Sequence, residues 1–211
     1  MGLFDHKQTN HYEAQPLYTL GNSQNLLIVG LGNIGATYTD TRHNIGFKAV
    51  DMYHESRDFS DWIEKRDLQC FLATGIVGST RVIIIKPTTM MNLSGEAVHR
   101  VMQFYKITEP ETLVIHDELD LSFGTVKTKT GGGSAGHNGI KSILQHVAGD
   151  FGRIRIGIGP KTPEQIDTAD FVLQKFTDEQ LESSRKILKE VSALIDERTV
   201  ETLNERTIRV L

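Results

Sequence analysis

The stretch RVIIIKPTTMMNLSGEAVHRVMQFYKITEPETLVIH, residues 81–116, contains two short apolar segments with an amphipathic segment between them. The apolar segments, 81–86 and 113–116, have the length of buried strands. Residues 94–105 carry apolar side chains at helical spacing, namely Val98, Val101, Met102 and Tyr105. A strand, a helix and a second strand in this order are typical of α/β proteins.

The same alternation continues on both sides of this stretch. Further strands are expected at 26–29, 68–77, 125–130 and 153–158, and helices from near Asn44, at 138–147 and from Thr177, where Thr-Asp-Glu-Gln is a capping-box pattern. Gly78-Ser79 is typical of a hairpin turn. We therefore predict a single α/β domain over 25–211, with a mixed, mostly parallel twisted sheet flanked by helices and a long C-terminal helix. Residues 1–24 show neither period, and we expect a flexible extension there.

The composition excludes several classes of protein. The chain has 211 residues and is 38% hydrophobic, which is enough for a globular core. No apolar run reaches the length of a membrane span, and the first residues lack the pattern of a signal peptide. The single cysteine, Cys70, lies among apolar neighbours and is expected to be a buried small side chain. We expect a soluble, cytoplasmic protein that does not bind membranes.

The charge is distributed unevenly along the chain. The net charge is -4, but the segment 125–161 has Asp150 as its only acid against six basic residues, namely Lys127, Lys129, Lys141, Arg153, Arg155 and Lys161. From Thr162 onward acids outnumber bases. The basic segment indicates either a surface that holds phosphates or a solvated strand face balanced by an acidic helix.

Polar residues gather where the predicted strands end. Four such stretches are Gly30–Asn33, Thr41–Asn44, Met90–Gly95 and His116–Asp120, and the segment Gly131–Gly139 adds a fifth. In an open α/β sheet, ligands bind at the carboxyl ends of the strands, so these residues indicate a chemical site. A histidine, an aspartate and several amides can move protons without a metal.

One apparent nucleotide motif fails on its context. Gly30, Gly32 and Gly35 match the dinucleotide-binding fingerprint, but that motif opens directly into a helix. Here a polar segment, 37–43, follows, and no later strand places an acid for a ribose. We therefore expect no nucleotide cofactor.

Several motifs together resemble the bacterial-type peptidyl-tRNA hydrolase family. They are Val29–Asn33, Tyr38, Thr41–Phe47, Lys86–Gly95, His116–Asp120, Gly136–Gly139 and Arg155–Gly159, and they cover roughly 26–176. The resemblance implies a monomeric α/β enzyme that hydrolyses the ester between a peptide and tRNA, without a metal or other cofactor. Met90 departs from the family pattern, which usually has tyrosine there.

The chemistry of the candidate residues agrees with this activity. Ester hydrolysis near neutral pH needs a base, and imidazole titrates close to that pH, so His43 is the candidate base and Asp117 its partner. Side-chain amides can stabilise an oxyanion or hold water, which suits Asn33, Asn92 and Asn138. Asn44 is expected to be a helix N-cap instead.

The resemblance also implies residues that bind the substrate. It places Asn92 with the peptide, Tyr38 and Met91 on the floor of the cleft, and His137 beside them. From the charge pattern we further expect Lys127, Lys129 and Lys141 to hold phosphates of the tRNA; the first two share one face of a strand.

The sequence disfavours three other interpretations. A metal site from His116, Asp117, Glu118 and Asp120 does not suit a strand, because alternate side chains point to opposite faces. Ser94 and Ser134 do not lie in a nucleophile-elbow pattern. The third is a non-catalytic RNA-binding relative of the splicing-factor type, which could lose His43, Asp117 and Asn33; the presence of all three favours the enzyme.

Overall fold

A computed structural model describes residues 24–211, so the predicted extension, except for its last residue, lies outside the described residues. The described chain forms one eight-stranded sheet in the order β2-β3-β4-β1-β5-β7-β6-β8. The strands are β1 (Asn25–Gly30), β2 (Ile63–Lys65), β3 (Cys70–Val77), β4 (Thr80–Pro87), β5 (Thr112–Ser122), β6 (Thr125–Thr130), β7 (Gly152–Gly159) and β8 (Arg206–Arg209).

The centre of the sheet is parallel and its two edges are antiparallel. β1 pairs in parallel with β4 and β5, and β5 pairs in parallel with β7. β3 and β6 run in the opposite direction, and the edge strands β2 and β8 pair antiparallel with them. Six of the eight strands share one direction, and three of the seven neighbouring pairs are parallel, which confirms the predicted mixed sheet.

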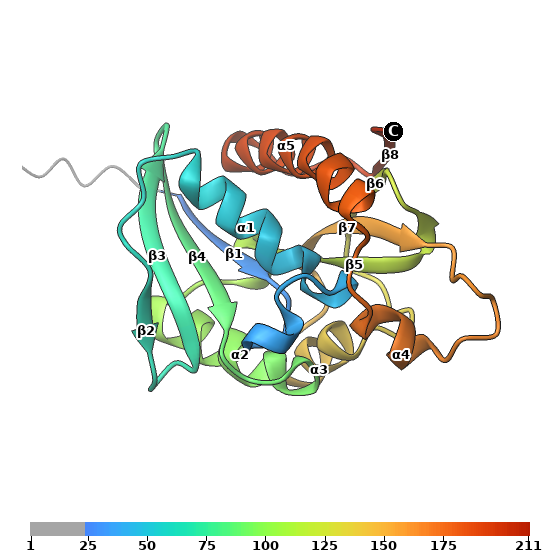
Figure 1. Ribbon diagram of the computed structural model, residues 1–211. Helices are drawn as coiled ribbons and strands as arrows, with labels where there is room; N and C mark the ends of the chain where they lie inside the picture. Colours follow the sequence, from blue (N-terminus) through green and yellow to red (C-terminus); the bar gives the residue numbers. More distant parts are fainter. Residues whose placement is uncertain (1–23) are drawn as a thin grey trace, which may run out of the picture.

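Helices cover both faces of the sheet (Figure 1). They are α1 (Ile45–Glu55), α2 (Ser94–Tyr105), α3 (Asn138–His146), α4 (Thr168–Leu173) and α5 (Asp178–Val200). On β1, Leu26 and Ile28 pack in the core under α1 and α5, whereas Leu27 and Val29 pack under α2 and α3. Because both faces of β1 are buried, its sequence is apolar without alternation. Within residues 24–211, no helix is both long and apolar enough to cross a membrane.

The ends of several elements differ from the prediction. β5 continues to Ser122, six residues beyond its expected end, because its polar second half still pairs with β7. The short strands β2 and β8 and the six-residue helix α4 were not expected. The capping box at Thr177 is confirmed. Cys70 is buried in β3, and burial raises the pKa of its thiol to about 12, which agrees with a packing role.

The glycines of the apparent nucleotide motif serve close packing. A Cβ atom on Gly30 would lie 2.6 Å from the backbone oxygen of Gly46, and one on Gly32 would lie 2.6 Å from the ring of Phe47. Both contacts are with the first turn of α1, so these glycines let that helix approach the end of β1.

The polar loops meet at one place because of the strand order. β1 pairs with β5 only as far as Gly30 and Ile115, and β5 continues beyond that point. The chain leaves β1 toward α1 on one face, and after β5 and β6 it reaches α3 on the other face (Figure 1). A crevice between strands whose connections diverge in this way is where α/β proteins bind ligands.

Candidate active site

A buried aspartate is the centre of the site. Asp117, on β5, is 3% exposed, and its Oδ1 atom lies 2.8 Å from Nδ1 of His43 and 3.0 Å from Nε2 of His137. His43 belongs to a short 3-10 turn, Arg42–Asn44, that precedes α1, whereas His137 immediately precedes α3. The two rings therefore reach one carboxylate oxygen from opposite sides of the sheet.

The hydrogen bonds fix where each ring carries its proton. Nδ1 of His137 accepts hydrogen bonds from the backbone N–H groups of Gly139 (3.1 Å) and Ile140 (3.2 Å), so its proton is on Nε2 and points to Asp117. His43 donates to Asp117 from Nδ1. Its Nε2 makes no hydrogen bond with any residue from 24 to 211, which leaves a lone pair free for a water molecule.

Burial and charge act in opposite directions on this pair. Burial alone would lower the pKa of His43, but the negative charge of Asp117 and the hydrogen bond to it outweigh burial, and the pKa is raised. Burial would raise the pKa of Asp117, but the two histidines hold it well below its usual range. Asp117 is therefore an anion throughout the neutral range, and it stabilises a positive charge on His43.

A third histidine supports the cluster from the α3 side. Nδ1 of His116 donates to the backbone oxygen of Asp117 at 2.7 Å, and its ring packs edge-on against His137 with 4.7 Å between centroids. Burial, and next the neighbouring His137, hold the pKa of His116 well below its usual range. His116 is therefore neutral and acts as packing for the pair.

Asn33 is held by its neighbours on both sides. Its Oδ1 accepts a hydrogen bond from the backbone N–H of Met91 at 2.7 Å, so its side-chain NH2 group is left as a donor. Its backbone N–H donates to Oδ1 of Asn44, and its backbone oxygen accepts from Nδ2 of Asn44, both at 2.9 Å. Asn44 stands at the N-cap of α1 but caps nothing with its side chain. The predicted N-cap position is confirmed, but the side chain is used for the contact with Asn33 instead, and the sequence carried no signal for this contact.

The remaining predicted residues surround this centre. Met91 is buried, and a Cβ atom on Gly139 of α3 would lie 2.5 Å from its sulfur, so the turn Met91–Leu93 packs directly on the start of α3. Asn92 and Asn138 are exposed on these two packed elements. Tyr38 is half-buried, and its backbone oxygen accepts hydrogen bonds from Thr41 just before the His43 turn.

A buried arginine fixes the His43 turn to the C-terminal part of the chain. The guanidinium of Arg42 stacks on the ring of Phe171 at 4.4 Å and donates to the backbone oxygen of Lys175 at 3.1 Å. The backbone N–H of Arg42 also donates to the carbonyl of Gln174. These contacts tie the His43 turn to α4 and the residues just after it, and nothing in the sequence pattern indicated them.

Several basic side chains of the segment 125–161 already have partners within the protein. Arg153 is 3% exposed and donates to the backbone oxygens of Gly132 and Gly133, so it supports the glycine run. Arg155 pairs with the buried Glu118 at 2.8 Å. Lys127 lies 3.4 Å from Glu205, an acid far away in sequence. Lys129 and Lys141 make no ion pair within the described residues.

The cluster also has the composition of a metal site. One ligand atom each from His43, Asp117 and His137 lie within 4.8 Å of one another. However, both nitrogens approach the same oxygen at 2.8 and 3.0 Å, whereas ligands about 2.1 Å from a tetrahedral zinc ion stand roughly 3.4 Å apart. The spacing fits hydrogen bonds better than metal ligation. Among the described residues, His116, Glu118 and Asp120 do not join this group of ligand atoms, so the four acids and histidines of 116–120 do not converge.

The chain is similar in sequence to one family of known proteins over most of its length. The profile of the peptidyl-tRNA hydrolase family matches residues 27–210. Peptidyl-tRNA hydrolases of Rhodospirillum centenum and Bartonella bacilliformis are 50% and 47% identical over 71% and 72% of this chain, and over 65% and 77% of their own lengths. That of Rhizobium rhizogenes is 52% identical over 64% of this chain. The match covers 56% of that relative, so this chain spans less than two thirds of two of the three.

A solved structure extends the similarity to the fold. The crystal structure of peptidyl-tRNA hydrolase from Acinetobacter baumannii superposes with a TM-score of 0.74 at 34% sequence identity. The superposition covers 86% of this chain and 94% of that chain.

Proposed function

The chain belongs to the peptidyl-tRNA hydrolase family, and we propose that it hydrolyses the ester bond between peptide and tRNA in peptidyl-tRNA. The observation that carries this proposal is the buried His43–Asp117 hydrogen bond of 2.8 Å, while the second nitrogen of His43 has no hydrogen-bond partner among residues 24–211. The products are a free peptide and a free tRNA. We further propose that the protein acts as a cytoplasmic monomer, as the family resemblance implies.

The reaction begins with the activation of water. Nε2 of His43 takes a proton from a water molecule as its oxygen attacks the ester carbonyl, and Asp117 stabilises the imidazolium that forms. When the tetrahedral intermediate collapses, the bond to the ribose oxygen breaks and His43 returns the proton to that oxygen. The proton count closes, and no cofactor is needed for any step.

The amides supply the charge stabilisation. The carbonyl oxygen becomes negative in the intermediate, and the NH2 group of Asn33 is held as a donor because its Oδ1 is bound to Met91. We assign Asn138, one residue after His137, to positioning the water, and Asn92 to the peptide. Tyr38 and Met91 form the floor of the cleft.

For His137 we propose a role other than the expected contact with substrate. Both of its ring nitrogens are already bonded, one to Asp117 and one to the start of α3, so neither is left for substrate. We propose that His137 positions Asp117. A non-catalytic RNA-binding relative would not need this complete arrangement of buried hydrogen bonds, which favours the enzyme.

The decisive experiment is release of peptide from peptidyl-tRNA by the purified protein. The proposal predicts release that survives prolonged dialysis against a strong chelator, because hydrogen-bonded acid–base groups perform every step. No release from a folded protein would overturn the proposed function. Activity lost on chelation and restored by zinc or manganese would overturn the metal-free mechanism alone.

A further inference from the structure

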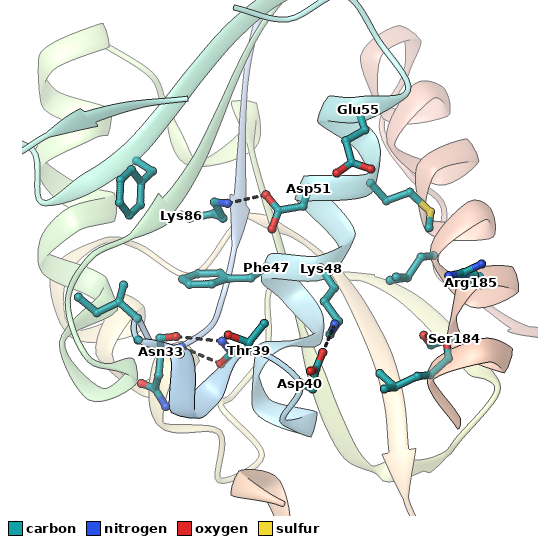
Figure 2. A pocket seen from close by; sticks show the side chains of 18 of the residues that line it. Asn33, Thr39, Asp40, Phe47, Lys48, Asp51, Glu55, Lys86, Ser184 and Arg185 are labelled. Carbon is teal, nitrogen blue, oxygen red and sulfur yellow. Dashed lines mark hydrogen bonds and ion pairs between the residues drawn. The ribbon is translucent and has the colours of Figure 1, made fainter. Parts of the chain in front are cut away.

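A groove of about 900 Å³ runs over the outer face of α1, between α5 and the strands β3 and β4 (Figure 2). Asn33 and Asn44 line it, whereas His43, Asp117 and His137 do not. The groove therefore adjoins the catalytic centre at the amide that we assign to the ester carbonyl. In Figure 2, Asn33 lies at one end and Glu55 at the other.

We propose that this groove holds the peptide part of the substrate and favours peptides with basic side chains a few residues from the ester. The inference rests on the proposed function, because it takes the ester to lie beside Asn33. It adds a direction for the peptide and a preference for its charge.

The charges of the groove set this preference. Lys48 pairs with Asp40 at 2.7 Å and Lys86 pairs with Asp51 at 2.5 Å, so these four charges largely cancel. The other charged lining residues are three acids and one base, namely Glu55, Asp178, Glu182 and Arg185, and none of them makes an ion pair within the described chain. The excess is negative.

An acidic groove repels RNA phosphates and attracts basic peptide side chains. Lys129 and Lys141, which make no ion pair in the described part of the chain, lie on the other side of the sheet, the side of α2 and α3. The two parts of the substrate would therefore leave the ester in opposite directions, the tRNA toward the basic side and the peptide toward the acidic groove.

The surface and length of the groove suit an extended peptide. Phe47 and Phe71 line it and are half-buried, so they offer apolar contact to side chains without requiring one sequence. From Lys48 to Glu55, α1 extends about 10 Å at its rise of roughly 1.5 Å per residue. An extended peptide advances about 3.3–3.6 Å per residue, so roughly three residues lie along this part. Counted from the ester, they are expected to be the third to fifth.

The test uses three substrates on one tRNA: pentapeptides with lysine, or with glutamate, at the third to fifth residues, and a single N-acetylated amino acid too short to reach the groove. The variant is Glu55→Lys/Glu182→Lys, in which both side chains are exposed. The control is Glu190→Lys/Glu201→Lys, which makes the same change of charge outside the groove. Glu190 lies within α5, and Glu201 directly follows this helix.

We expect the parent to show a KM for the lysine peptide roughly two- to tenfold below that for the glutamate peptide at low salt, the range for one or two exposed ion pairs. The groove variant should have the lower KM for the glutamate peptide instead. The control variant should keep the parental order, and the KM of the groove variant for the short substrate should equal that of the parent. Unchanged preference in the groove variant, or an equal change on the short substrate, would overturn the inference and leave the proposed function standing. A parent inactive on all three substrates would overturn both.

Discussion

His43 and His137 contact the same oxygen of Asp117, yet their surroundings differ at the second ring nitrogen. The Nδ1 atom of His137 accepts two backbone hydrogen bonds at the start of α3. The Nε2 atom of His43 makes none within the described residues. The Nε2 atom of His43 is therefore available to accept a proton, whereas both ring nitrogens of His137 are already hydrogen-bonded. Two histidines with one partner can thus have different roles, and the second nitrogen decides which role each has.

The largest effect is expected when the imidazole ring of His43 is removed. We expect His43→Ala to lower kcat by roughly two to four orders of magnitude, the range for a general base, with little change in tRNA binding. Single-turnover hydrolysis and a separate tRNA-binding assay would measure the two effects. His99→Ala, on α2 outside the cluster, is the matched control. Near-normal turnover in folded His43→Ala would remove this residue from the mechanism.

The shared carboxylate is tested by pH. His43 must be neutral to accept a proton, so kcat/KM falls as the pH drops through its pKa, which Asp117 raises. Asp117→Asn removes that charge and leaves burial, which lowers the pKa. The acidic limb of the profile should therefore move to lower pH, and the maximal rate should fall by about one to three orders of magnitude, less than for the loss of the base.

The same variant gives a test of coupling. If His43 and Asp117 act as one unit, the double variant should lose much less than the product of the two separate losses. Losses that multiply, or an acidic limb that stays in place in Asp117→Asn, would contradict the assignment of Asp117 as the partner of His43.

Two substitutions of His137 separate its hydrogen bond to Asp117 from its role as the N-cap of α3. His137→Ala removes both the bond to Asp117 and the cap of α3, and should cost about 1 kcal/mol of unfolding free energy for the cap. His137→Asn keeps a good capping residue and should recover most of that stability. Both should reduce kcat, by roughly tenfold, because Asp117 loses one of its two donors. Denaturant unfolding and kinetics measure the two effects, and a kcat loss as large as that of His43→Ala would make His137 a second base.

The sequence predicted the elements that have a strong period and missed those that do not. The apolar run of β1 and the helical spacing in α2 identified both elements, and Thr177 marked the start of α5. β2 and β8, of three and four residues, are too short for a period, and the second half of β5 is polar. Its pairing with β7 is a tertiary contact that no local pattern contains.

In the candidate site, too, the sequence identified some residues and missed the contacts between others. Strand ends and the family resemblance led to His43, Asp117 and Asn33, because these positions follow from the α/β topology. The hydrogen bonds of Asn44 to Asn33 and of His137 to Asp117 depend on how segments far apart in the sequence meet in space. Asparagine before a helix indicates a cap in most proteins, so the local pattern pointed to the commoner role.

The smallest effects are expected for the lysines of the basic segment. There the comparison is between lysines without an ion pair in the described chain and a lysine that has one. Lys129 and Lys141 make no ion pair within the described residues, whereas Lys127 lies 3.4 Å from Glu205. If the free lysines hold tRNA phosphates, Lys129→Ala or Lys141→Ala should each raise KM, leave kcat nearly unchanged, and reduce the salt slope of tRNA binding by about one unit.

For Lys127 the expected loss is smaller, because Glu205 already neutralises part of its charge. Lys127→Ala should therefore reduce the salt slope by less than about one unit, whereas Glu205→Gln should strengthen binding by releasing the lysine. Lys189→Ala, on α5, controls for the loss of one positive charge away from this side. Binding titrations at several salt concentrations measure all of these variants. If a variant with all three lysines replaced binds tRNA with the parental affinity and slope, the basic segment is only a solvated face, and the substrate is held elsewhere.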